Sequence, residues 1–80
     1  ADEDVIWPSF TRALDFELEF GCYVAQRAKN VPRERARDVI YGYTIFNDVS
    51  ARDVQAVEMA GMLGPAKRKD FDTANVMGPC

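Results

Sequence analysis

The sequence predicts a small α+β domain that is rich in β-strand. The segment 14–20 alternates apolar with acidic residues, and 43–48 is rich in aromatic and β-branched side chains, so both are typical of strands. Segments 32–40 and 50–59 carry apolar residues at helical spacing. The chain has 80 residues, 48% of them hydrophobic, which bounds it to one small domain. Because these segments are short, we expect a mixed sheet rather than a parallel βαβ unit.

Residues 1–12, which precede the first strand, are polar and irregular, and we expect Trp7 and Phe10 to anchor them on the edge of the sheet. Residues 13–25 then form an acidic strand, in which alternation predicts one face on the core and one in solvent. Glu17 and Glu19 share the solvent face, with Cα atoms roughly 7 Å apart. Two glutamates at this spacing can close on one hard cation; the alternative is a solvated face that protects an edge strand from aggregation. Gly21 indicates a bulge or a close backbone approach.

The segments after this strand are taken in chain order. Residues 26–31 read as a loop, and Pro32 suits the first turn of an amphipathic helix over 32–40, which Gly42 ends. A second strand ends at Asp48. Ser50, with Asp53 three residues later, matches a capping box, so we expect Ser50 to be the N-cap and Asp53 to support it in a helix that runs to about residue 59. A turn (62–65), a basic loop (66–70) and the start of another strand (71–79) follow.

Composition narrows the classes of partner and metal. The net charge of −3 disfavours nucleic acid, and no apolar run approaches the roughly 20 residues that span a bilayer. The chain has no histidine, so we expect any metal to be held by oxygen, which favours Mg²⁺, Ca²⁺ or Mn²⁺ over Zn²⁺. Cys22 and Cys80 are too few for a disulfide framework and indicate a reducing, cytoplasmic compartment, with a single bridge left open. The start lacks a signal peptide and an initiator Met, so we expect a piece of a longer protein.

Five charged residues from separate segments form a candidate site. Glu17, Glu19 and Asp48 supply three carboxylates, which suit an oxygen-coordinating metal. Arg52 on the second helix would bind the carboxylate of an anionic substrate by a two-pronged hydrogen bond. Lys69 in the basic loop would donate to an enolate oxygen as it develops.

Three motifs in this order are similar to those of the fumarylacetoacetate hydrolase family. They are DFELEF (15–20), GYTIFNDVSARDVQ (42–55) and KDFDT (69–73), followed by Gly-Pro at 78–79. The chain therefore resembles the central part of that family's catalytic domain, which implies a mixed β-sheet roll that is usually dimeric. Residues 1–80 are expected to be a single, partial copy, with the acidic metal-binding strand at 13–25, a helix at 32–40, the strand-helix signature at 43–55 and the lysine loop and strand at 69–79.

The resemblance also implies site roles. The metal ligands are Glu17, Glu19 and Asp48, usually for Mg²⁺, Mn²⁺ or Ca²⁺. The other site residues are Arg52 and Gln55 as substrate contacts, Lys69 as a substrate contact and as the catalytic group at the oxyanion, and Thr73 beside the metal.

The expected activity is divalent-metal-dependent hydrolysis of a C–C bond in an acylpyruvate or another β-diketo acid. The alternatives on the same fold are oxaloacetate decarboxylation or tautomerisation and 2-hydroxy-dienoate isomerisation. An inactive structural or binding fragment is the alternative of another class.

The chain departs from the family pattern at three points. Arg68 stands where many members have Gly, and Asp70 and Asp72 add negative charge beside the lysine. Hydrolytic members carry a His on an N-terminal lid, and this chain has none. We therefore expect either that the region is incomplete or that the base for hydrolysis is a water or another carboxylate.

Overall fold

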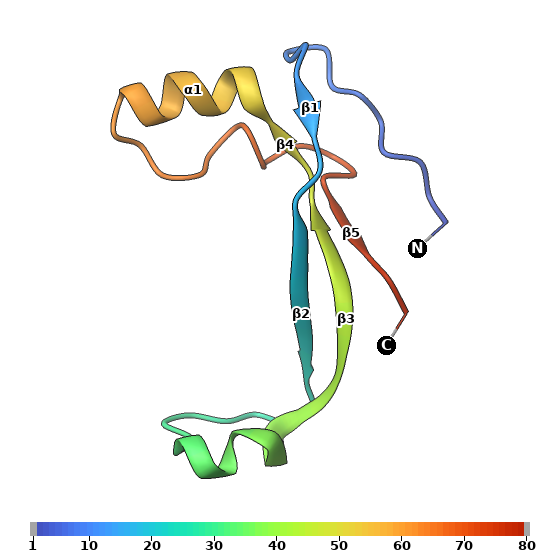
Figure 1. The fold of residues 1–80 in the computed structure, drawn as a ribbon, viewed down its shortest axis with the longest axis vertical. Coiled ribbons are helices and arrows are strands. Elements are labelled where there is room, and N and C mark those ends of the chain that lie inside the picture. Colours follow the sequence, from blue (N-terminus) through green and yellow to red (C-terminus); the bar gives the residue numbers. More distant parts are fainter. Residues whose placement is uncertain (1, 80) are drawn as a thin grey trace.

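The computed structural model describes residues 2–79, so Cys80 and a bridge from it to Cys22 lie outside the described part. The elements in order are strands β1 (Leu14–Asp15) and β2 (Leu18–Val24), the 3₁₀ helix η1 (Arg33–Val39), strands β3 (Ile40–Asp48) and β4 (Ser50–Ala51), helix α1 (Arg52–Ala60) and strand β5 (Asn75–Met77). This is the β-rich α+β fold that the sequence predicts (Figure 1). Within residues 2–79 no helix is long and apolar enough to cross a membrane.

All strand pairs are antiparallel, in two small sheets. The larger sheet has the order β2-β3-β5, and β1 pairs with β4 in the smaller one. Leu18 at the start of β2 lies opposite Asn47 near the end of β3. This register brings the first residues of the acidic strand beside the last residues of β3. Gly21 marks a close approach of a side chain rather than of the predicted backbone, because a Cβ there would lie 3.2 Å from Thr44 Cγ2 and 3.7 Å from the Thr44 carbonyl oxygen.

The predicted strand over 13–25 is in fact two strands. Residues 16–17 interrupt it, and β1 leaves the larger sheet to pair with β4. The backbone N–H of Glu17 donates to the side-chain Oδ1 of Asn47 at 3.2 Å instead of to a strand partner. The interruption places the Glu17 side chain at the junction of the two sheets rather than in a regular ladder.

The apolar face of the β2–β3 ribbon is exposed, although its alternation predicts burial. Phe20 and its cross-strand partner Ile45 are 80% and 63% exposed, and Phe20 stacks on Tyr43 with ring centroids 5.0 Å apart. Leu18 and Phe16 are also largely exposed. The two helices lie at opposite ends of the ribbon rather than over it (Figure 1). Alternation therefore identifies the strand correctly but not its burial.

Most of the buried residues gather where β1, β4 and the loop before β5 meet. They are Val49, Ala51 and Ala74, with the polar residues Thr11, Ser50, Glu58 and Arg68, whereas Thr44 is buried separately within β3. Backbone hydrogen bonds close this junction, from Ala51 N–H to the Arg68 carbonyl at 2.9 Å and from Val49 N–H to the Ala74 carbonyl at 3.0 Å. The loop that carries Lys69 is thereby fixed against the end of β3 and β4.

The segment predicted as an amphipathic helix over 32–40 differs in kind and length. It is the 3₁₀ helix η1, none of whose residues is buried. β3 begins at Ile40, and Gly42 lies inside this strand, so Gly42 does not end the helix. The apolar residues from Ile40 onward pair with β2, and this long-range pairing overrides their helical spacing.

The predicted capping box is also wrong. Ser50 lies in β4, and the N-cap of α1 is Ala51, which makes no side-chain cap bond. Asp53 instead ties the N-terminal segment to α1, because it accepts hydrogen bonds from the Arg12 N–H at 2.9 Å and from the Thr11 hydroxyl. These two bonds, in that order of importance, hold the pKa of Asp53 below its usual value.

The two aromatic residues of the N-terminal segment do not pack on a sheet edge. Trp7 is 57% exposed, and its indole N–H donates to the Thr11 carbonyl at 2.8 Å. Phe10 packs edge-on against Phe71, with ring centroids 5.9 Å apart. Their predicted role as sheet-edge anchors is therefore wrong, since Phe10 contacts the loop before β5 instead.

Candidate metal centre

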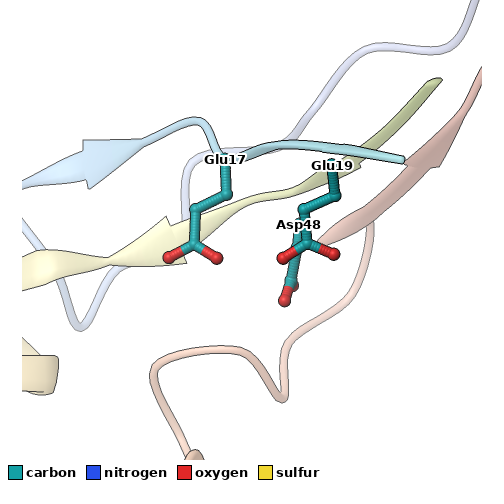
Figure 2. A group of neighbouring side chains, drawn as sticks. All are labelled: Glu17, Glu19 and Asp48. Carbon is teal, nitrogen blue, oxygen red and sulfur yellow. The ribbon is translucent and has the colours of Figure 1, made fainter. Parts of the chain in front are cut away.

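Three carboxylates meet where the two sheets join. Glu17 lies between β1 and β2, Glu19 lies in β2, and Asp48 ends β3. One oxygen from each lies within 4.8 Å of the others, and Figure 2 shows the three side chains on the same side of the ribbon. A backbone hydrogen bond from Asp48 N–H to the Glu17 carbonyl, at 3.3 Å, fixes the two segments together. The structure thus brings together the three acids that the sequence singles out.

The donor set of this cluster fits a hard divalent cation. It consists of carboxylate oxygens, and the chain contains no histidine to compete as a ligand. Mg²⁺, Ca²⁺ and Mn²⁺ prefer such oxygen ligands. Glu17 and Asp48 are partly buried and Glu19 is exposed, so the cluster is partly open to solvent.

The ammonium of Lys69 reaches two of the three acids. Its Nζ lies 2.6 Å from Asp48 Oδ2 and 2.8 Å from Glu17 Oε2, and it donates to Ser50 Oγ at 2.8 Å. Its side chain is only 19% exposed. Burial alone would lower the pKa of Lys69, but the hydrogen bonds to Asp48 and Glu17 outweigh it and raise the pKa. Lys69 is therefore a charged donor beside the carboxylates.

Arg52 contacts the other carboxylate oxygen of Glu17. Its Nη1 lies 2.6 Å from Glu17 Oε1 and 2.8 Å from Gln55 Oε1, and its Nε lies 2.9 Å from Asp15 Oδ2. The carboxylate of Asp15, followed by that of Glu17, raises the pKa of Arg52. As the first residue of α1, Arg52 connects the helix to the carboxylate cluster.

Glu17 is ionised under all ordinary conditions because two cations flank it. The hydrogen bond from Lys69 has the largest effect, partial burial opposes it, and Arg52 adds to it, so the pKa of Glu17 falls from 4.5 to about 2. A carboxylate must be deprotonated to bind a metal ion. The Glu17 carboxylate could therefore bind a cation without the loss of a proton.

The lowered pKa of Glu17 predicts a pH-dependent contribution to stability. It contributes stability that is fully present above its unfolded pKa, near 4.5, and is lost as the pH falls toward about 2. We expect Glu17→Gln to lower the free energy of unfolding near neutral pH, with the difference from wild type shrinking between these values. Denaturant unfolding of the metal-free intact protein at several pH values measures this difference.

A matched control removes a negative charge elsewhere. Glu34 is exposed and lies in η1, at the far end of the ribbon from α1 (Figure 1). Glu34→Gln should leave the unfolding free energy near its wild-type value at neutral pH, since single surface changes are usually within about 0.5 kcal/mol. An equal loss in the two variants would contradict the ion-pair account of Glu17.

Two residues that contact the site are not predicted from the sequence as site residues. Ser50 accepts a hydrogen bond from Lys69 and donates one to the Asp48 carbonyl at 3.1 Å, but its spacing to Asp53 favoured a cap. Asp15 pairs with Arg52. The indication of this role in the sequence is that Asp15 alternates with apolar residues, which places it on the polar face of the strand.

The two remaining sequence candidates have other contacts. Gln55 lies beside Arg52 on α1, as the motif implies, and accepts its hydrogen bond. Thr73 has a left-handed backbone (φ 66°), and its hydroxyl accepts a hydrogen bond from Ile6 N–H at 2.9 Å. The placement of Thr73 beside a metal, and the roles in binding or catalysis of all the site residues, stay predictions.

Comparison with known proteins shows clear relatives. The family model described as "Fumarylacetoacetate (FAA) hydrolase C-terminal" matches residues 1–80. A fumarylacetoacetase of Caenorhabditis elegans is 43% identical over 72 residues, covering 82% of this chain and 17% of that protein. An oxaloacetate tautomerase of Bacillus subtilis is 36% identical over 69 residues, covering 86% of this chain and 22% of that protein.

A solved structure shares the fold. The structure titled "Crystal structures of Cg1458" superposes with a TM-score of 0.81 at 35% identity, over 94% of this chain and 28% of that chain. The family and the fold that the motifs imply are thereby confirmed. The chain spans 30% of the length of a relative from Archaeoglobus fulgidus and 33% of the length of one from Pyrococcus abyssi. These comparisons therefore show the family and not the activity of a whole protein.

Proposed function

Because the chain belongs to the fumarylacetoacetate hydrolase C-terminal family, we propose that it forms the metal-binding part of an enzyme that acts on a small 2-keto or β-diketo acid. The observation that carries this proposal is the cluster of Glu17, Glu19 and Asp48, with two cations beside it. The family includes hydrolases and tautomerases that generally bind a divalent metal, and this supports a metal-binding role for the cluster.

The preferred reaction is hydrolysis of a C–C bond in an acylpyruvate. The three carboxylates would hold Mg²⁺, or Mn²⁺ or Ca²⁺ in its place. When bound, such an ion supplies a Lewis acid for the 2-keto oxygen of the substrate. Water adds to the distal carbonyl, the C–C bond breaks with its electron pair left on the pyruvyl fragment as an enolate, and the enolate then takes a proton at carbon.

Two cationic side chains provide the remaining chemistry. Lys69 Nζ donates to the oxygen on which negative charge develops, a contact that stabilises the transition state more than the ground state. Arg52 binds the substrate carboxylate with N–H groups that now contact Asp15 and Gln55. The substrate carboxylate therefore has to displace at least one of these acceptors.

Oxaloacetate tautomerisation is the second candidate. Two observations favour it: the Bacillus subtilis relative carries this name, and the present 80 residues include no histidine to activate water. Tautomerisation moves a proton between carbon and oxygen without hydrolytic water, and the enolate of oxaloacetate would lie with its C2 oxygen against Lys69. Decarboxylation of oxaloacetate passes through the enolate of pyruvate, and isomerisation of a 2-hydroxy-dienoate passes through a dienolate, so each of these reactions also places negative charge on the oxygen at C2.

Metal removal tests the proposal. In the intact protein, we expect EDTA to stop the loss of absorbance of an acylpyruvate, and added Mg²⁺ to restore it. The same preparations, given oxaloacetate and analysed by NMR for enol, keto and decarboxylated products, separate hydrolysis from the alternatives. Activity that persists in EDTA and metal-free buffer would contradict the proposal.

A stability measurement addresses the alternative of a structural or binding fragment. Mg²⁺ at 100 times its Kd should add about 2.7 kcal/mol to the free energy of unfolding if the native state alone binds it. An unchanged melting temperature across a Mg²⁺ titration would favour the fragment.

A homodimer, as the family resemblance implies, is part of the same proposal, and sedimentation of the intact protein measures it.

A further inference from the structure

Glu58 is the only buried residue of helix α1, and it is an acid. The residue is 7% exposed. A carboxylate is almost never buried to this degree unless it is paired, because burial removes its hydration. The partners of Glu58, Ala66 and Arg68, lie in the loop that follows the helix, and Figure 1 shows this loop running back beside α1.

The partners of Glu58 are mainly backbone groups. Its Oε1 accepts a hydrogen bond from the Arg68 N–H at 3.1 Å, and its Oε2 accepts one from the Ala66 N–H at 3.4 Å. The Arg68 guanidinium is buried beside it, with Nη1 3.4 Å from Oε2, yet Nη1 and Nε make no hydrogen bond. The carboxylate therefore acts on this loop chiefly as an acceptor for backbone N–H groups.

The same loop carries Lys69. The Arg68 carbonyl accepts a hydrogen bond from Ala51 N–H at 2.9 Å, and Lys69 N–H donates to the Ala66 carbonyl at 3.0 Å. Residues 66–69 are thus held on one side by α1 and on the other by β4. The Lys69 ammonium, 2.6 Å from Asp48, projects from the end of this clamped segment.

We propose that Glu58 is a positioning residue, which holds the backbone of residues 66–69 so that the Lys69 ammonium reaches the carboxylate cluster. The proposal rests on the proposed function, because it assigns Lys69 a role in the reaction. A donor that stabilises a transition state has to be held within about 0.5 Å of its productive position. Glu58 does this through the loop that follows α1, without contacting the carboxylate cluster itself.

Two double variants of the intact protein separate the acceptor from the charge. Glu58→Gln with Arg68→Met removes both charges and keeps an acceptor oxygen. Glu58→Met with Arg68→Met has a similar volume and no acceptor. Arg68 is changed in both because a lone buried guanidinium is costly, whereas joint replacement of a buried ion pair by uncharged residues is often tolerated.

We expect the Gln variant to keep the wild-type kcat and the Met variant to lose about 10- to 100-fold, as for other outer partners of a site. KM should change little, since Lys69 acts mainly on the transition state. Amide hydrogen exchange at residue 68 should be faster in the Met variant alone, whereas exchange at residue 66 should be faster in both variants, because Gln keeps one acceptor oxygen and the bond from Arg68 N–H is the shorter of the two. Mg²⁺ affinity, measured by calorimetry, should be equal in both, which shows that the carboxylate cluster is intact.

Equal kcat in the two double variants would overturn the proposal. Should the Met variant fail to fold, the Gln variant decides, because a loss of kcat or of amide protection at residue 68 despite its retained acceptor also overturns the proposal. Lys69→Met separates a failure of the proposed function from a failure of the role proposed for Glu58. If this variant keeps full activity, the proposed role of Lys69 is wrong. The exchange rates at residues 66 and 68 still measure whether Glu58 holds the loop.

Discussion

Replacing Lys69 with Met is expected to lower kcat for the keto-acid reaction by about 100- to 1,000-fold, the loss typical when one preorganised donor to a developing oxyanion is removed. The side chain is 19% exposed and its ammonium donates to three oxygens, which hold it beside the carboxylate cluster. Met has an unbranched side chain of nearly the same length as that of Lys, and it carries no charge. Initial rates with an acylpyruvate and with oxaloacetate, at saturating Mg²⁺, measure the loss.

A matched control lies two residues earlier. Lys67 belongs to the same loop, is exposed, and places its Nζ 4.7 Å from the centre of the Phe10 ring. Lys67→Met removes the same charge and should leave kcat near the wild-type value. Mg²⁺ should bind the Lys69→Met variant at least as tightly as wild type, because the Lys69 ammonium and the ion compete for the same oxygens of Glu17 and Asp48. A weaker metal affinity with normal kcat would contradict the assignment.

Replacing Asp48 with Asn should weaken Mg²⁺ binding by about 100-fold or more. Loss of an outer partner of a metal ligand commonly costs about 10- to 100-fold, and Asn here removes the charge of the ligand itself. The amide also loses one acceptor oxygen that now faces Lys69, at 2.6 Å. Titration calorimetry of the intact protein with Mg²⁺, after chelator treatment, measures the change.

Asp72→Asn is the control for this variant. Asp72 is an exposed acid in the loop that leads to β5, so its loss changes the net charge equally. It should leave the Mg²⁺ affinity close to wild type, since exposed charges are screened by salt. Unchanged Mg²⁺ binding in Asp48→Asn would show that Asp48 is not a ligand.

The sequence predicts the carboxylate cluster because the family motifs include both of the segments that supply it. Alternation places Glu17 and Glu19 on one side of the strand, and the end of the next strand supplies Asp48. The antiparallel register of Leu18 with Asn47 then brings the three together. A register is a long-range property, yet here the family motifs contain both strands and so carry it implicitly.

Other features depend on tertiary contacts that local patterns do not record. Ile40 has helical spacing to its neighbours, but pairing with β2 makes it the start of β3. Ser50 stands at cap spacing, but the junction of the sheets draws it into β4 and against Lys69. Burial of the apolar ribbon face fails as a prediction because period-two alternation reports the strand and not what covers it.

The arrangement of charges around Glu17 has a consequence for the order of addition. Four carboxylates, those of Asp15, Glu17, Glu19 and Asp48, surround only two cationic side chains. The surplus of negative charge repels a dianion such as oxaloacetate until a divalent ion has neutralised it. Ordered kinetics, with the ion entering ahead of the organic acid, are the expected result.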